Sequence, residues 1–88
     1  MSIHESSIIH PSAKIDRDVQ IGPFCVVGAN VEISSGSKLL SHVVIKGPSI
    51  IGKNNTFYQF CTIGEDTPDK KFKGEETTLE IGDENIFR

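Results

Sequence analysis

The 88-residue chain lacks a long hydrophobic run, a basic stripe and a recognisable leader. No apolar stretch approaches the ~20 residues that a membrane-spanning helix needs, so no membrane span is expected. The first ten residues, MSIHESSIIH, lack the charged and apolar regions of a signal peptide, and a cytoplasmic protein is therefore expected. The absence of clustered lysine and arginine argues against nucleic acid as a partner.

The net charge of −3 is unevenly distributed along the chain. Residues 1–63 contain five basic and four acidic side chains, whereas residues 64–88 contain four basic and eight acidic ones. A chain of this length is expected to form one domain, and a globule of this size buries only a modest core. A solenoid partly escapes that limit, because each of its coils packs only on its neighbours.

An apolar residue recurs at every sixth position over most of the chain. These positions are Ile3, Ile9, Ile15, Ile21, Val27, Ile33, Leu39, Ile45, Ile51, Phe57 and Ile63. Four residues after each of the first ten comes a smaller one: Ser7, Ala13, Val19, Cys25, Val31, Ser37, Val43, Ser49, Asn55 and Cys61. A period of six does not match the 3.6-residue turn of an α-helix. It predicts a solenoid of very short strands separated by turns.

Each hexad is predicted to contain one strand and one corner. The smaller residue, the next residue and the following apolar residue should alternate in, out and in. Residues that permit positive φ or close backbone approach fall at the corners: Gly22, Gly28, Gly36, Gly47, Gly52, Asn30 and Asn54. Cys25 and Cys61 both occupy the inward position, and we interpret them as buried free thiols, in preference to a disulfide or a metal site.

Three hexads make a triangular coil of eighteen residues, and successive coils stack about 4.8 Å apart. Each hexad begins with an apolar residue, which is often followed by glycine, and has a small residue at its fifth position. This repeat resembles that of the hexapeptide-repeat transferases. This resemblance implies that the coils wind as a left-handed helix. The predicted fold is all-β: a left-handed parallel β-helix, shaped as a triangular prism, with one extruded loop.

A single β-helical domain is expected over residues 1–88. It comprises a capping coil (1–8), regular coils (9–63), an extruded loop (64–80) and a resumed coil (81–88). Eighteen residues separate Ile63 from Ile81, so one polar coil is an alternative to the loop. The loop is favoured because residues 65–76 place no apolar side chain where a core needs one. Binding residues often lie on such loops, although a merely solvated loop would have the same composition.

Counting in eighteens also predicts an apolar outer face. Phe24, His42 and Phe60 should stack at one corner, beside the outward strand residues Val26, Val44 and Thr62, whereas the stack of Gln20, Lys38 and Thr56 is polar. We predict that the apolar face is a subunit interface of a cyclic trimer, with scattered surface residues as the alternative. The other histidines, His4 and His10, form no defensible metal-ligand set with His42, and no metal site is assigned.

The segments around the loop resemble the acyl-[acyl-carrier-protein]–UDP-N-acetylglucosamine O-acyltransferases, which open lipid A biosynthesis. The matching runs are 57–65, then Asp69, Lys71, Phe72, Gly74, Glu75 and Thr77, then Glu80 to Asp83 with Asn85 and Arg88. Shorter runs at 21–24, 31–33 and 41–44 also match, so the likeness spans nearly the whole chain. The loop motif is more specific than the hexads, which many transferases share.

The resemblance implies transfer of a 3-hydroxyacyl group from acyl carrier protein to the 3-hydroxyl of UDP-N-acetylglucosamine, without a cofactor. It also implies a homotrimer with sites between adjacent subunits, and it places Asp69 and Lys71 in the substrate-binding cleft. There, Asp69 can accept a hydrogen bond from a sugar hydroxyl, and Lys71 can bind an anionic or carbonyl oxygen. The chain departs from the family pattern at Pro68, Lys70 and Phe72, which affects the expected details of sugar binding.

The family's general base is a histidine, and no histidine follows His42 here. We therefore assign no catalytic residue, since the expected histidine would lie beyond Arg88. The chain is interpreted as the N-terminal part of a longer enzyme, or as a truncated copy, that is inactive alone.

Three alternatives remain at this stage. One is another hexapeptide acyltransferase, such as an N-acylating relative or a sugar or serine acetyltransferase, against which the loop motif argues. The second is a β-helical carbonic anhydrase, which would need three histidines converging on zinc. The third is a non-catalytic scaffold, which the missing histidine favours.

Overall fold

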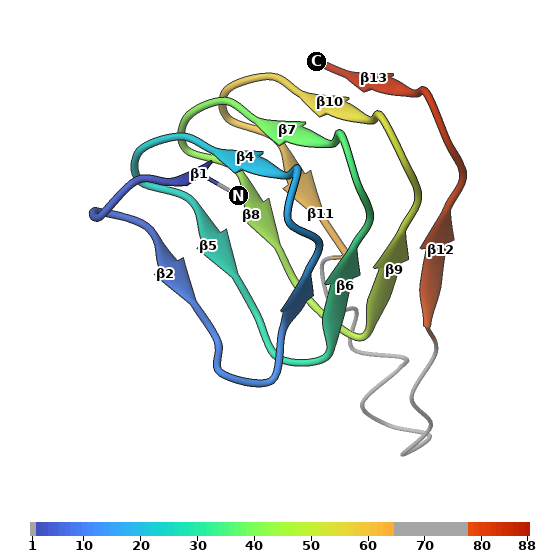
Figure 1. The fold of residues 1–88 in the computed structure, drawn as a ribbon, viewed down its shortest axis with the longest axis horizontal. Helices are drawn as coiled ribbons and strands as arrows, with labels where there is room; N and C mark the ends of the chain where they lie inside the picture. The colour runs from blue at the N-terminus through green and yellow to red at the C-terminus, as the bar shows by residue number, and fades with distance from the viewer. Residues whose placement is uncertain (1, 65–77) are drawn as a thin grey trace.

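The computed structural model describes residues 2–64 and 78–88, and all of its regular elements in these ranges are short β-strands (Figure 1). They are β1 (Ser2–Ile3), β2 (Ile8–Ile9), β3 (Lys14–Ile15), β4 (Gln20–Ile21), β5 (Val26–Val27), β6 (Val31–Ile33), β7 (Lys38–Leu39), β8 (Val44–Ile45), β9 (Ser49–Ile51), β10 (Thr56–Phe57), β11 (Thr62–Ile63), β12 (Leu79–Ile81) and β13 (Ile86–Phe87).

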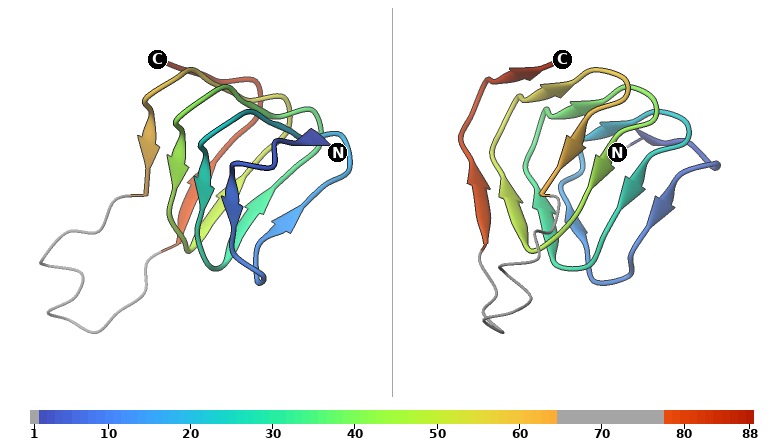
Figure 2. Two further views of the ribbon diagram at one scale, coloured as in Figure 1. Left: turned by 90° about the vertical axis from the view of Figure 1, so that its left-hand side faces the viewer. Right: turned by 180° about the vertical axis from the view of Figure 1, so that it is seen from behind.

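The strands form three parallel sheets, one on each side of a triangular prism (Figure 2). The first face contains β1, β4, β7, β10 and β13, the second contains β2, β5, β8 and β11, and the third contains β3, β6, β9 and β12. Strands pair with the strand one coil later, as Ile3 with Ile21 and Ile9 with Val27. This eighteen-residue step is three hexads, and the predicted left-handed parallel β-helix is confirmed.

The core is a column of inward side chains along the prism axis. In the described part of the chain, twelve hydrophobic residues are buried: Val19, Ile21, Cys25, Val27, Val31, Ile33, Leu39, Val43, Ile45, Ile51, Phe57 and Cys61. The expected alternation is clear in β6, where Val31 and Ile33 are buried and Glu32 is exposed. Cys25 and Cys61 are buried free thiols, as predicted.

Glycine serves the corners in two distinct ways. Gly36 adopts a positive φ of 79°, which costs glycine little. Gly22 does not need positive φ; instead, a Cβ built there would lie 1.9 Å from the carbonyl oxygen of Leu40 in the next coil. The backbones of neighbouring coils therefore approach too closely at Gly22 for any side chain.

Gly22→Ala is expected to lower the free energy of unfolding by about 1–3 kcal/mol, because the added methyl must push the two coils apart. Gly28→Ala is the matched control: its Cβ would meet the nearest atom, the carbonyl oxygen of Ile45, at 3.4 Å, an ordinary contact. Thermal unfolding of both variants tests this difference. If the two substitutions lowered the stability equally, the close approach of the coils would not decide whether these corners accept a side chain.

The register changes between β11 and β12. Ile81 pairs with Ile51 and Phe87 pairs with Phe57, so these partners lie thirty residues apart instead of eighteen. Twelve extra residues are thus accommodated before β12, which pairs with β9. Residues 65–77, where most of the extruded loop is predicted, lie outside the described ranges. β12 begins at Leu79, so its first two residues belong to a strand and not to the predicted loop.

The coil after the insertion is joined to the preceding one by polar and aromatic contacts. The buried Asn55 donates from Nδ2 to the carbonyl oxygen of Gly82 at 2.7 Å, and its Oδ1 accepts the N–H of Asn85 at 2.8 Å. The rings of Phe57 and Phe87 stack with centroids 4.8 Å apart and planes 5° from parallel. Asn55 thus fixes the corner at which this coil begins its final strand.

Candidate functional site

An aromatic corner joins the first and second faces. The His42 ring lies between Phe24 and Phe60, with centroids 5.2 and 5.1 Å away and planes tilted by 33° and 30°. This is the stack expected from the eighteen-residue spacing. Phe24 is 59% exposed and Phe60 is 77% exposed, so large rings remain in contact with solvent in the single chain.

All three residues of the aromatic corner adopt left-handed backbone conformations. Their φ angles are 58° at Phe24, 55° at His42 and 66° at Phe60. Such angles are uncommon for residues other than glycine and are unfavourable for bulky side chains. The hexad pattern assigned this role to glycine and asparagine, and it gave no signal that aromatic residues would share it.

An apolar strip runs along the outside of the second face, next to the aromatic corner. Val26 pairs with Val44, and Val44 pairs with Thr62, so these predicted outward residues lie in one row. The row continues to Ile8, which pairs with Val26 and is 67% exposed. The predicted row omits Ile8 because the regular coils are expected to begin at residue 9, whereas β2 already pairs with β5 in the same eighteen-residue register.

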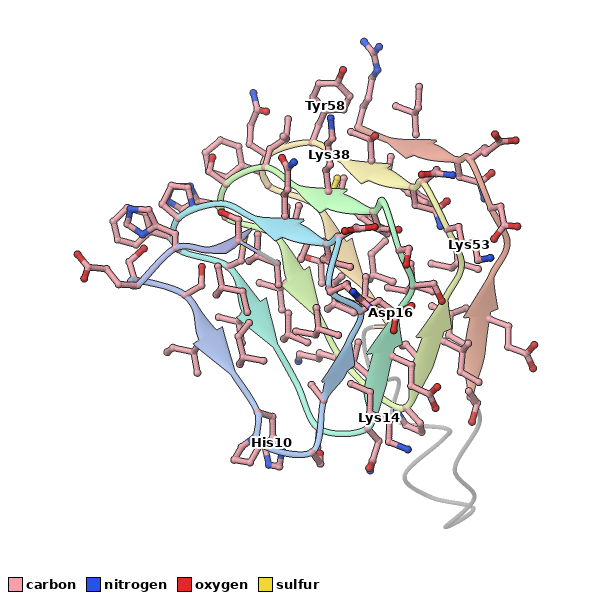
Figure 3. All side chains as sticks on the ribbon, in the orientation of Figure 1. His10, Lys14, Asp16, Lys38, Lys53 and Tyr58 are labelled. Carbon is pink, nitrogen blue, oxygen red and sulfur yellow. The ribbon has the colours of Figure 1, made fainter. Side chains whose placement is uncertain are left out.

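The other two faces are more polar on their outer sides. The first face presents Gln20, Lys38 and Thr56 from β4, β7 and β10; Figure 3 shows Lys38 and Tyr58 projecting from this side. The third face presents Lys14 and Glu32 from β3 and β6. Within the described ranges, the outer row of the second face carries no charged side chain.

The insertion begins at the corner between the second and third faces. Gly64 follows β11 with φ of 77°, and a Cβ there would lie 2.5 Å from the carbonyl oxygen of Lys46 in the coil below. Asp69 and Lys71 fall in the segment outside the described residues, so the structure does not place them. The strand that ends the apolar strip therefore leads directly into the predicted substrate loop.

A shallow groove of about 350 Å³ lies over the polar first face, away from the insertion. Its lining includes Ser2, Gln20, Pro23, Lys38, Leu40 and Ser41. Its lining is mixed, because Ile21 and Leu39 lie among these polar side chains. It does not overlap the aromatic corner or the apolar strip.

The three histidines are spread over two corners and two coils. His4 and His42 are two coils apart at the corner of the first and second faces, and His10 lies at the next corner. Over residues 2–64 and 78–88 the structure holds no group of three or more histidine, cysteine, aspartate or glutamate side chains that could bind a metal ion. In the same ranges it holds no helix with the length and apolar character needed to cross a membrane.

Comparison with known proteins places this geometry in a family. The family model for bacterial transferase hexapeptide (six repeats) matches residues 1–35. Acyl-[acyl-carrier-protein]–UDP-N-acetylglucosamine O-acyltransferase of Saccharophagus degradans is 55% identical over 86 residues, which are 98% of this chain and 33% of that protein. The enzyme of the same name from Psychrobacter sp. is 52% identical over the same shares.

Solved structures support the same relationship. UDP-N-acetylglucosamine O-acyltransferase from Moraxella catarrhalis RH4 superposes with a TM-score of 0.92 at 48% identity, covering 100% of this chain and 34% of that one. The chain thus spans about a third of the length of the relatives that it matches. By sequence and by fold, it is a hexapeptide-repeat protein homologous to that third of the acyl-[acyl-carrier-protein]–UDP-N-acetylglucosamine O-acyltransferases, as its resemblance to them predicted.

Proposed function

We propose that the chain forms part of an acyltransferase that moves a 3-hydroxyacyl group from acyl carrier protein to the 3-hydroxyl of UDP-N-acetylglucosamine, the first step of lipid A biosynthesis. The observation that carries this proposal is the 55% identity to a relative of that name over 98% of the chain, a span that includes the loop motif. A reaction on a cytosolic carrier protein and a sugar nucleotide fits a cytoplasmic location.

The proposed enzyme works as a homotrimer assembled through the apolar strip and the aromatic corner. The strip offers Ile8 and Val26 to solvent in the single chain, at 67% and 38% exposure. Contiguous apolar surface of this kind is typical of a covered interface. Because β11 belongs to this face and leads into the insertion, a subunit covering the strip would lie beside the loop, where a site shared by two subunits would form.

Within that site, Asp69 and Lys71 are proposed to bind substrate, Asp69 by accepting a hydrogen bond from a sugar hydroxyl and Lys71 by holding an anionic or carbonyl oxygen. Neither residue deprotonates the attacking hydroxyl in this scheme. That step needs the family's histidine base, and the sequence contains no histidine after His42. A second candidate is a non-catalytic assembly module, which the exposed residues of the apolar strip would serve equally well.

A chimera tests the proposed function. We expect transfer activity when this chain replaces the matching third of the Saccharophagus degradans relative, measured with radiolabelled UDP-N-acetylglucosamine and 3-hydroxyacyl carrier proteins of several chain lengths. The chain alone should give no turnover. A chimera that assembles but transfers none of the acyl groups would favour the assembly module.

In that chimera, Asp69→Asn and Lys71→Met are each expected to lower kcat/KM about tenfold or more, because each removes a charge-assisted hydrogen bond. Lys73→Met and Glu76→Gln are matched controls: they fall in the same predicted loop, at positions that do not take part in the motif. Controls that lose as much activity as the test variants would argue that the loop acts through its overall charge.

A further inference from the structure

Two corners of the first coil contain the same hydrogen-bonding unit, a histidine followed two residues later by serine. At the first corner, Nδ1 of His4 accepts the backbone N–H of Ser6 at 3.1 Å and lies 2.8 Å from its Oγ. At the second, Nδ1 of His10 accepts the N–H of Ser12 at 3.0 Å and lies 2.9 Å from its Oγ. Figure 3 shows His10 at the corner between β2 and β3.

Each serine hydroxyl links this unit to the second coil. Oγ of Ser6 accepts the N–H of Phe24 at 2.9 Å, and Oγ of Ser12 accepts the N–H of Asn30 at 3.0 Å. Both donors have left-handed backbones, with φ of 58° and 59°. One coil later, at the corner between the first and second faces, the acceptor is a backbone carbonyl: the oxygen of Pro23 accepts the N–H of His42.

The donors determine where the imidazole proton must be. A backbone N–H can only donate, so Nδ1 must present its lone pair, and the proton of a neutral ring must lie on Nε2. Each serine Oγ already accepts an amide, so its own hydrogen is free to point at Nδ1. A doubly protonated imidazole would carry an N–H at Nδ1, so the bond from the serine N–H could not form, and the contact with Oγ could persist only with Nδ1 as its donor.

We propose that His4 and His10 are acceptor caps that hold the first coil on the second, and that proton uptake by either ring releases its corner. Histidine is the side chain suited to such a change, because it ordinarily gains its proton between about pH 8 and pH 5. The cap is therefore intact on the alkaline side and is lost as the pH falls.

Few other charges face these corners. The second coil, residues 20–37, is the element on which the first coil packs, and its charged side chain is Glu32, on the third face opposite Lys14. Gly22 and Gly28 lie one coil above His4 and His10, and Lys46 lies two coils above His10. Glu5 is the charged neighbour within the first corner. Lys14 of β3 follows the second corner in the first coil.

Release would matter because the first coil covers the end of the core. Its inward Ile9 and Ile15 are only partly buried, whereas Val27 and Ile33, their partners in the second coil, are buried. The first coil is also held by backbone hydrogen bonds to the second, for example from the N–H of His10 to the carbonyl oxygen of Val27. Losing both caps would loosen these contacts and expose the second coil.

The test is amide exchange at Phe24 and Asn30, corrected for the intrinsic exchange rate. From about pH 7.5 to about pH 5.5, protection of both amides should fall about tenfold in the wild-type chain. In the double variant His4→Asn, His10→Asn it should stay constant, because an asparagine Oδ1 accepts as Nδ1 does but does not titrate. The double alanine variant should be poorly protected at both pH values.

Constant protection in the wild type, or an equal fall in the asparagine variant, would overturn the proposal. Imidazole nitrogen chemical shifts provide a check that needs no variant. At the alkaline end both rings must be Nε2–H tautomers, and an Nδ1–H tautomer at either residue would contradict the assigned cap.

Discussion

Val44→Glu is expected to convert a trimeric wild-type chain into a monomer in sedimentation velocity at matched concentration. Val44 lies in the middle of the apolar strip, paired with Val26 on one side and Thr62 on the other. In the proposed trimer its side chain is covered by a neighbouring subunit. Each introduced carboxylate would then be buried without a partner, at a cost of about 3–5 kcal/mol per subunit.

Gln20→Glu is the matched control for that substitution. It adds the same single charge, but at an exposed position on the polar first face. This variant should sediment as the wild type does. A Val44→Glu chain that stays trimeric would exclude the strip as the interface, and a monomeric wild-type chain would leave the loop motif and the sequence identity as the support for the proposed function.

Most of the architecture follows from the hexad period. An apolar residue at every sixth position can face one axis only if the chain turns a corner within each hexad. Since three such turns close a triangle, residues eighteen apart must pair, as Ile3 and Ile21 do. The same count placed Phe24, His42 and Phe60 in one stack, and their ring centroids are 5.1–5.2 Å apart.

The pattern could not supply details that depend on backbone conformation and strand ends. It assigned left-handed corners to glycine and asparagine, yet Phe24 and His42 adopt them as well. The intrinsic preference of large side chains disfavours the left-handed conformation. Its presence at these residues is therefore seen only once the coils are packed on one another. Ile8 is a different case: it lies eighteen residues before Val26, so the count reaches it once the outward row is extended into the first coil.

The two parts of the candidate site were predicted on different grounds. The apolar strip and the aromatic corner follow from the repeat, because outward positions recur with the same period as inward ones. Asp69 and Lys71 were identified by resemblance alone, since the insertion has no repeat from which to place a side chain. They lie outside the described residues, and their role remains a proposal.

The coil that follows the insertion depends on a single buried amide. Asn55 is 0% exposed and makes two bonds to that coil, one to the carbonyl oxygen of Gly82 and one from the N–H of Asn85. Leucine has the same branching at Cγ but can neither donate nor accept a hydrogen bond. Asn55→Leu would therefore leave two polar backbone groups without partners at the corner where β13 is positioned.

Each orphaned group costs about 1–3 kcal/mol, so Asn55→Leu is expected to lower the free energy of unfolding by about 2–6 kcal/mol. The loss should begin locally, because the amides of Thr56 and Tyr58 donate to Asn85 and Phe87 of the last coil and would exchange faster than those of β5. Ser49→Ala is the matched control, since this buried hydroxyl in the same coil donates to the carbonyl oxygen of Lys46, within its own turn. If both variants lost protection uniformly along the prism, the last coil would be held by its stacked phenylalanines and its strand ladder, and Asn55 would be one more core residue.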